Sequence, residues 1–217
     1  MLKNPNIKFL FICLSILLVS TSISSWIQSS KGAVEVSSFV LPTQNNQSLA
    51  VDFFIPNSAT SDNKAPFIVV IPGFQRSKEA LSNIAIELAR RGFVVASIDP
   101  YAQGHSSSSM SRRSATTEGY GMFALVDHVY ASDQYNFIDK TRIGATGHSA
   151  GGNAAIRGAN YFGKESIETG MPSKLHSVFV SGYVLTMRNS VLKDVRSNVG
   201  MSYALYDEGA YRNELKN

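Results

Sequence analysis

Short hydrophobic runs alternate with helical stripes along most of the chain. Pro66 to Ile71 and Phe93 to Ile98 are dominated by apolar residues, which is typical of strands covered on both faces. Between them, Ser77 to Arg91 places apolar residues at the spacing of one helix face, and Gly92 follows as a stop signal. This alternation predicts an α/β domain with a mostly parallel central sheet flanked by helices.

The rest of the domain continues this alternation after a different start. Val34 to Leu41 and Ser48 to Ile55 predict a hairpin-like pair of strands. The stretch from Gln103 to Ser111 is rich in Gly and Ser, and we expect a loop that is too polar to pack. The remaining expected elements are helices at Thr116–Ala131 and Ala150–Phe162 and strands at Thr141–Thr146, Ser177–Val184 and Asn198–Tyr206.

A separate apolar segment precedes this domain. Two lysines stand ahead of the hydrophobic run Phe9 to Val19, and a Ser/Thr-rich stretch continues to Ile27. Positive residues before an apolar run mark an export signal and remain on the cytoplasmic side. The run has signal-peptide length, whereas the whole stretch approaches the roughly 20 residues that span a bilayer. We expect residues 1–30 to be a signal peptide or transmembrane anchor, and residues 33–217 to be an extracytoplasmic domain.

Composition narrows the possible function classes. The chain has 217 residues, of which 44% are hydrophobic and 17% charged, enough for one buried core. Its net charge of +4 comes from basic residues spread in ones and twos, so nucleic-acid binding is not expected. Cys13 is the single cysteine and lies in the apolar segment, which excludes an internal disulfide and a cysteine-based zinc site.

The strongest chemical signal is Gly147-His148-Ser149-Ala150-Gly151, between a predicted strand and a predicted helix. A serine in such a sharp turn needs small residues two positions before and after it, and the turn exposes its hydroxyl at the sheet edge. The helix beginning at Ala150 points its positive end there, and the Ala150 N–H can donate to an oxyanion. The pattern predicts that Ser149 is a nucleophile; an ordinary loop with this spacing is the alternative.

The stretch from Phe67 to Gly152 resembles the α/β-hydrolase family, and most closely its dienelactone-hydrolase, acetylhydrolase and cutinase-like branches. Ile71-Pro72-Gly73-Phe74 matches the loop that supplies the second oxyanion donor, which implies the Phe74 backbone N–H; an ordinary Pro-Gly turn is the alternative. The segment ending at Asp99 is similar to the family's fourth strand, so Asp99 is interpreted as structural. The resemblance implies an α/β-hydrolase fold and neither a metal nor an organic cofactor.

The triad partners are harder to place. In this family the chain order is serine, acid, histidine. Asp207 ends a predicted strand as the family's acid does, although an exposed acid near a chain end is the alternative. His176 is the only later histidine, but it precedes a strand and therefore belongs at the opposite edge of the sheet. His105, His128 and His148 are interpreted as a loop residue, a helix residue and the variable residue of the motif.

The family pattern is also incomplete at the C-terminus, because its final strand, last helix and histidine are not found. Our first hypothesis is an exported or membrane-anchored serine hydrolase that cleaves a small-molecule, lipid or polymer ester. Ser149 would be the nucleophile, Phe74 and Ala150 the oxyanion hole, and Asp207 would orient a histidine absent from this chain. The alternatives are a catalytically incomplete fragment, a non-catalytic binding domain, or a serine peptidase of the same fold.

Overall fold

A computed structural model of the chain describes residues 5–43, 46–107, 117–182, 192–202 and 204. Within them a seven-stranded sheet has the order β1-β2-β4-β3-β5-β6-β7. The strands are β1 (Val34–Pro42), β2 (Ser48–Pro56), β3 (Ala65–Ile71), β4 (Val94–Ile98), β5 (Ile138–His148), β6 (Ser177–Ser181) and β7 (Asn198–Ser202). The helices are α1 (Pro5–Gln28), α2 (Ser82–Arg90), α4 (Met122–Ala131) and α5 (Ala150–Thr169), with 3-10 turns η2 (Lys78–Leu81), η3 (Gly119–Gly121) and η4 (Asp133–Tyr135).

The direction of the strands decides where the loops meet. β1 and β2 form the expected antiparallel hairpin, and β2 is also antiparallel to β4. From β4 through β3, β5, β6 and β7, neighbouring strands are parallel. The segments that follow β3, β4 and β5 therefore leave the sheet at one edge. The mostly parallel sheet confirms the predicted α/β-hydrolase architecture.

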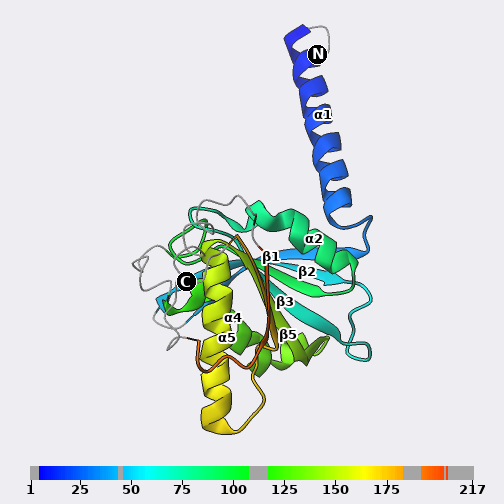
Figure 1. Ribbon diagram of the computed structural model, residues 1–217. Coiled ribbons are helices and arrows are strands. Elements are labelled where there is room, and N and C mark those ends of the chain that lie inside the picture. The colour runs from blue at the N-terminus through cyan, green and yellow to red at the C-terminus, as the bar shows by residue number, and fades with distance from the viewer. Residues whose placement is uncertain (1–4, 44–45, 108–116, 183–191, 203, 205–217) are drawn as a thin grey trace.

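Helices cover both faces of the sheet, with α2 and α5 on opposite sides (Figure 1). On the side of α4 and α5, Phe67 and Val69 of β3 join a large core that includes Phe162 of α5. On the other side, Val70 packs with Ala85 of α2 in a second, smaller core. Because successive side chains of β3 enter two different cores, this strand must be apolar throughout.

Two helices begin later than the sequence predicts. The segment expected to be helical from residue 77 to 91 starts with the 3-10 turn η2, and the α-helix begins only at Ser82. The helix expected from residue 116 starts at Met122. The cause is the backbone of Tyr120 and Gly121, whose φ angles of 55° and 95° are incompatible with an α-helix.

The loop after β4 also differs from expectation, because part of it packs. Ser106 is buried, with 8% exposure, and its hydroxyl donates to the Asp99 carbonyl and accepts from the Ala50 N–H. The Ser107 N–H donates to the Ser48 carbonyl. For residues 103–107 the prediction of a loop too polar to pack was wrong, since Ser106 and Ser107 both find backbone partners. The rest of the predicted loop, residues 108–111, lies outside the described residues. The predicted strand ends at Val184 and Tyr206 lie outside the described residues.

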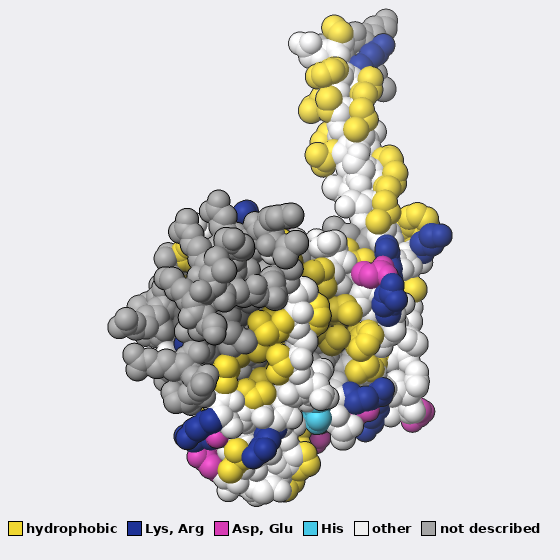
Figure 2. Space-filling view, in the orientation of Figure 1, with side chains coloured by type: hydrophobic (Ala, Val, Ile, Leu, Met, Phe, Trp, Pro, Cys, Tyr) yellow, Lys and Arg dark blue, Asp and Glu magenta, His cyan; other side chains and the backbone are white. Residues whose placement is uncertain are grey.

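The N-terminal helix α1 projects from the domain (Figure 1), and Figure 2 shows hydrophobic side chains along its length. It has 24 residues and is long and apolar enough to cross a membrane, and its apolar span is not buried against the domain. A contact at its base is the hydrogen bond from the Arg90 guanidinium to the Ile27 carbonyl, at 3.2 Å. The chain thus carries the expected N-terminal apolar helix, and a signal sequence would have the same properties.

Candidate active site

Ser149 stands between the end of β5 and the start of α5, as the motif predicts. Its φ of 53° and ψ of −116° are rare for a residue with a side chain. The Ser149 N–H donates to the Ser181 carbonyl at 3.0 Å, and the Ser149 carbonyl accepts from the Asn153 N–H at 3.1 Å. These bonds hold a half-buried serine in a strained strand-to-helix turn at the C-terminal edge of the sheet.

The two glycines of the motif are required by the backbone that surrounds them. A Cβ at Gly147 would lie 2.3 Å from the carbonyl carbon and oxygen of Gly151. A Cβ at Gly151 would lie 2.0 Å from the Ile71 carbonyl oxygen and 2.6 Å from that of Pro72. Backbone atoms cannot swing aside as a flexible side chain can. Both glycines are therefore needed for the first turn of α5 to lie against the end of β3.

The loop after β3 passes directly beside the serine. A Cβ built on Gly73 would lie 3.5 Å from the Ser149 Cβ and 3.3 Å from the His148 carbonyl oxygen. Phe74 follows Gly73, and Ala150 is the first residue of α5. The first amides of a helix have no acceptor within the helix and carry its partial positive charge. The fold thus brings Ser149, Phe74 and Ala150, which the sequence pattern grouped, to one edge of the sheet.

His176 and His148 flank β6 at opposite ends. The His176 N–H donates to the Ile143 carbonyl at 2.8 Å, near the start of the paired part of β5, whereas Ser149 follows the end of that strand. The expectation that His176 lies at the far edge is confirmed. His148 is exposed, and its ring lies near Gly73 and Gly182, where built Cβ atoms would approach it to 3.3 Å and 2.9 Å.

The other two histidines have partners away from the serine. The His128 ring on α4 lies 3.2 Å from the Tyr135 hydroxyl. The His105 side chain is 81% exposed, and its Nδ1 lies 3.3 Å from the Asp99 carboxylate. Within the part of the chain that the structure describes, no hydrogen bond joins a histidine to the Ser149 hydroxyl. Asp207, the expected acid, lies outside that part.

Asp99 ties together two loops at this edge of the sheet. Its carboxylate is completely buried and accepts hydrogen bonds from the backbone N–H groups of Lys78, at 2.7 Å, and His105, at 2.8 Å. A Cβ on Gly104, whose φ is 54°, would lie 2.3 Å from the Asp99 carboxyl carbon. One loop follows β3 and the other follows β4. These contacts support the structural role expected for Asp99.

An ion pair braces the same region. The Lys78 ammonium donates to Asp52, at 2.8 Å, and to Glu79, at 3.1 Å. Partial burial opposes the charge on Lys78, but these hydrogen bonds outweigh it and raise the Lys78 pKa. A hydrogen bond with the Ser77 side chain, aided by Lys78, lowers the pKa of Glu79 to about 2. Lys78 and Glu79 therefore both remain ionised at neutral pH.

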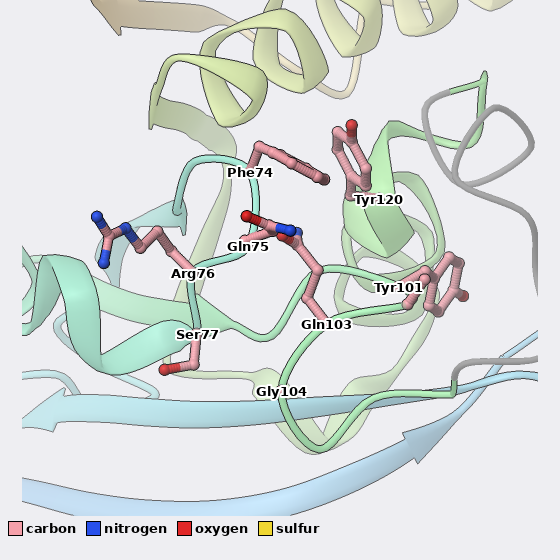
Figure 3. Close-up of a pocket in the computed structure, with 9 residues that line it drawn as sticks. Phe74, Gln75, Arg76, Ser77, Tyr101, Gln103, Gly104 and Tyr120 are labelled. Carbon is pink, nitrogen blue, oxygen red and sulfur yellow. The ribbon is translucent and has the colours of Figure 1, made fainter.

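A cavity of about 460 Å³ opens between these two loops and η3 (Figure 3). Phe74 forms part of its wall and directly follows Gly73, where a built Cβ would lie 3.5 Å from the Ser149 Cβ. Neither this cavity nor the buried amide of Gln103, which belongs to its lining residues, was predicted from the sequence, since the loop after β4 was expected to be too polar to pack. The lining residues are Phe74, Gln75, Arg76, Ser77, Tyr101, Ala102, Gln103, Gly104 and Tyr120.

No group of three or more His, Cys, Asp or Glu side chains suited to a metal ion was found within the described ranges. A strained serine, the first turn of a helix and a glycine-lined loop meet at one place. That combination suits attack on a carbonyl carbon with stabilisation of the resulting oxyanion.

Comparisons with known proteins agree with this geometry. A family model described as PET hydrolase-like matches residues 20–208. A bis(hydroxyethyl) terephthalate hydrolase from Streptomyces coelicolor is 28% identical over 116 residues, which are 53% of this chain and 34% of that protein. The hypothetical protein PA2218 from Pseudomonas aeruginosa aligns with 70% of this chain and 44% of its own, with a TM-score of 0.55 and 23% identity. Thermogutta terrifontis esterase 2 aligns with 85% and 91%, with a TM-score of 0.58 and 14% identity.

The solved structures and the family model establish different things about this chain. The solved structures share the α/β-hydrolase fold with this chain at low sequence identity. The chain spans about a third of the curated relative and less than half of the Pseudomonas protein, by the shares of 34% and 44%. The family model, in contrast, covers most of the chain, including β3, the Ser149 turn and β7. The chain therefore belongs to the PET hydrolase-like family of α/β hydrolases.

Proposed function

We propose that the chain carries the nucleophile of a serine hydrolase that cleaves carboxylic esters through an acyl-enzyme. The Ser149 Oγ attacks the ester carbonyl carbon while a base takes its proton, and that proton then leaves with the alcohol. Water attacks the acyl-enzyme in the same way and releases the acid. The observation that carries this proposal is the strained Ser149 turn, with φ 53°, between β5 and α5.

The backbone N–H groups of Phe74 and Ala150 are proposed to hold the developing oxyanion. Their support is positional: a Cβ built on Gly73, the residue before Phe74, would lie 3.5 Å from the Ser149 Cβ, and Ala150 is the first residue of α5. Two fixed donors aimed at a developing negative charge are a large part of such catalysis. Loss of one donor typically costs about 10²–10³ in kcat.

The proposed acid is Asp207, and its histidine partner is not assigned to any of the four histidines of this chain. The rings of His105, His128 and His176 bond elsewhere, and the His148 ring lies beside Gly73 and Gly182. A triad enzyme without its histidine keeps about 10³–10⁴-fold catalysis over water from the oxyanion hole and binding. Weak activity of this chain is therefore measurable with an activated ester.

The proposed substrate is a small-molecule, lipid or polymer ester. The proposed site of action is outside the cytoplasm. The name of the 28% identical Streptomyces hydrolase and the description of the matching family support the ester class. The apolar helix α1, which is not buried against the domain, supports export or anchoring. Lysines at its start agree with a cytoplasmic N-terminus.

Chemical rescue tests the proposal. The full chain in mild detergent is assayed with 4-nitrophenyl butyrate, with and without exogenous imidazole as a substitute base, against Ser149→Ala. Imidazole should increase the hydrolysis rate in both samples. We expect this increase to be about tenfold larger for the wild-type chain than for the variant. Equal rates for both chains under both conditions would contradict the proposal.

A non-catalytic binding domain or an incomplete fragment is the second candidate. The observation that favours it is the lack of any hydrogen bond from a histidine to Ser149 among the residues described. This candidate predicts that imidazole gives no rescue that depends on Ser149. The same assay therefore separates the two candidates.

A further inference from the structure

A hydrogen-bonded turn joins α1 to the domain. The Lys31 N–H donates to the Trp26 carbonyl at 2.8 Å, which folds the chain back at the end of the helix. The side-chain amide of Asn57, just past β2, donates to the Gly32 carbonyl at 2.9 Å. These bonds fix the turn to the helix on one side and to the sheet on the other. The domain is therefore held close to the end of α1, in contrast to a domain on a flexible linker.

Basic side chains surround this turn. The Arg90 guanidinium, at the end of α2, donates to the Ile27 carbonyl at 3.2 Å. The Lys31 ammonium lies 5.7 Å from the centre of the Trp26 ring. Arg91 follows Arg90, and its side chain is 68% exposed. Figure 2 shows Lys and Arg side chains gathered where α1 meets the domain. Trp26, Lys31, Arg90 and Arg91 are called the collar below.

The arginines of the collar remain available to another anion. Glu87 lies 2.8 Å from the Arg91 guanidinium and 4.0 Å from that of Arg90, so one carboxylate serves both arginines. The Glu87 side chain is itself 52% exposed. An exposed ion pair of this kind contributes little free energy, because water and salt screen it. A phosphate group can therefore bind these arginines without a large loss of existing interactions.

The collar lies where the apolar span of α1 ends. That span runs from Pro5 to Ile27 and has the length of about 20 residues that crosses a bilayer. Trp26 is in its last turn and is 53% exposed. Tryptophan is enriched at the level of lipid headgroups, because its ring is apolar and its N–H is polar. With α1 across a membrane, Trp26 marks the headgroup level, and Lys31 and Arg90 lie beside it.

We infer that the collar binds the phosphate groups of anionic phospholipids and thereby docks the domain on the membrane that α1 enters. The inference rests on the proposed anchoring by α1 and is independent of ester hydrolysis. Guanidinium groups bind phosphate oxygens through paired N–H donors, and an ammonium group binds them as a point charge. Each basic side chain near an anionic membrane surface strengthens binding by about fivefold.

Docking through the collar leaves the Ser149 turn uncovered. Arg90 and Arg91 directly precede β4 and so lie at the edge of the sheet where β4 begins. β4 and β5 are both parallel to β3, and Ser149 follows the end of β5. The collar and the serine are therefore at opposite edges of the sheet. Lipid binding by the collar does not compete with substrate binding.

Fluorescence of Trp26 tests the inference, because it is the single tryptophan of the chain. The full chain is reconstituted in vesicles of phosphatidylcholine and phosphatidylglycerol in equal parts, with bromine on the acyl chains of one lipid or the other. Quenching then reports which lipid is enriched beside Trp26. We expect a preference for phosphatidylglycerol of at least about tenfold at low salt, which weakens at high salt.

Two variants compare the collar with another exposed charge. Arg91→Gln removes one charge of the collar, and we expect it to lower the preference about fivefold. Lys164→Gln, on α5, is the matched control. The Lys164 side chain is 62% exposed and, like Arg91, pairs with a glutamate one helical turn away, Glu168 at 3.5 Å. The control should leave the preference unchanged, and circular dichroism checks that both variants are folded.

The outcomes separate this inference from the proposals on which it rests. Equal quenching by the two brominated lipids would overturn the inference and leave the anchoring by α1 intact. A preference that Arg91→Gln does not change, or that Lys164→Gln lowers equally, would overturn the role of the collar. No quenching by either lipid would show that α1 does not enter the bilayer and would overturn the inference together with the anchor. Failure of ester hydrolysis alone would contradict only the proposed enzymatic function.

Discussion

Gly151→Ala is the substitution whose effect follows most directly from the structure. The added methyl group would lie 2.0 Å from the Ile71 carbonyl oxygen and 2.6 Å from the Pro72 carbonyl oxygen. A methyl carbon and a carbonyl oxygen need more than 3 Å between them. That distance is about 1 Å longer than this site allows. Since both neighbours are backbone atoms, either α5 or the end of β3 must shift.

That shift should lower both the stability and the activity of the variant. Forcing extra volume into a packed site costs typically about 1–3 kcal/mol, and the rigid neighbours place Gly151→Ala at the upper end. For a domain of this size, about 3 kcal/mol lowers the unfolding midpoint by roughly 6–12 °C. A displacement of about 1 Å between Ser149 and the amides of Phe74 and Ala150 should cost about 10²-fold in hydrolysis.

The assay combines thermal unfolding, followed by circular dichroism, with imidazole-assisted hydrolysis of 4-nitrophenyl butyrate. Gly170→Ala is the matched control, because its Cβ would meet no heavy atom within 4 Å although its φ of +70° remains unfavourable. The Gly170→Ala control should lose about 1 kcal/mol of unfolding free energy and keep its hydrolytic activity. If Gly151→Ala unfolds at the same temperature as Gly170→Ala and hydrolyses the ester as fast as the wild type, the close approach of α5 to β3 is refuted.

Three further predictions concern stability and location. Asp99→Asn places an amide NH₂ group or a weaker acceptor against the N–H groups of Lys78 and His105. We therefore expect the free energy of unfolding, measured with urea, to fall by about 2–4 kcal/mol. A fall of less than about 0.5 kcal/mol would contradict the structural role of Asp99. Hydrogen bonds from Thr141 and Arg142 hold the Asp139 pKa at about 2, below its usual 3.8. Because the folded pKa is the lower one, this stability is present above about pH 4 and is lost as the pH falls toward 2. Asp139→Asn should therefore flatten the stability curve of urea unfolding in that range, and an unchanged slope would count against the shift. Finally, Leu14→Arg in α1 should reduce the share of protein that stays with membranes after an alkaline wash, since a central charge costs about 2.5–3.5 kcal/mol; an unchanged share would argue against a membrane span.

The sequence predicted the Ser149 turn because its requirement is local. Gly147 and Gly151 must be small for the backbone of their own motif and of β3, and that need is visible in five consecutive residues. The strands were predictable for a similar reason, since β3 and β4 are apolar on both faces and only a sheet covered by helices buries both. The observed ends of these strands differ from the predicted ends by only a few residues.

The cavity and its polar lining could not be predicted in this way. The late start of α4 depends on the positive φ of Tyr120, which no residue pattern signals for a tyrosine. The packing of Ser106 depends on the Asp99 carbonyl in its own loop and on the Ala50 N–H of β2, a strand 56 residues away along the chain. The isolation of the Gln103 amide exists only because three segments meet around it. Such features arise from tertiary contacts and are absent from local sequence periodicity.

Mass spectrometry after treatment with a fluorophosphonate tests the central claim most directly. The full chain is treated in the presence of imidazole, digested, and searched for the phosphonate adduct on every serine, with Ser149→Ala treated in parallel. The account predicts one dominant adduct, on Ser149, and none in the variant. An adduct spread over other serines, or labelling that is the same in both proteins, would show that this turn does not activate its serine.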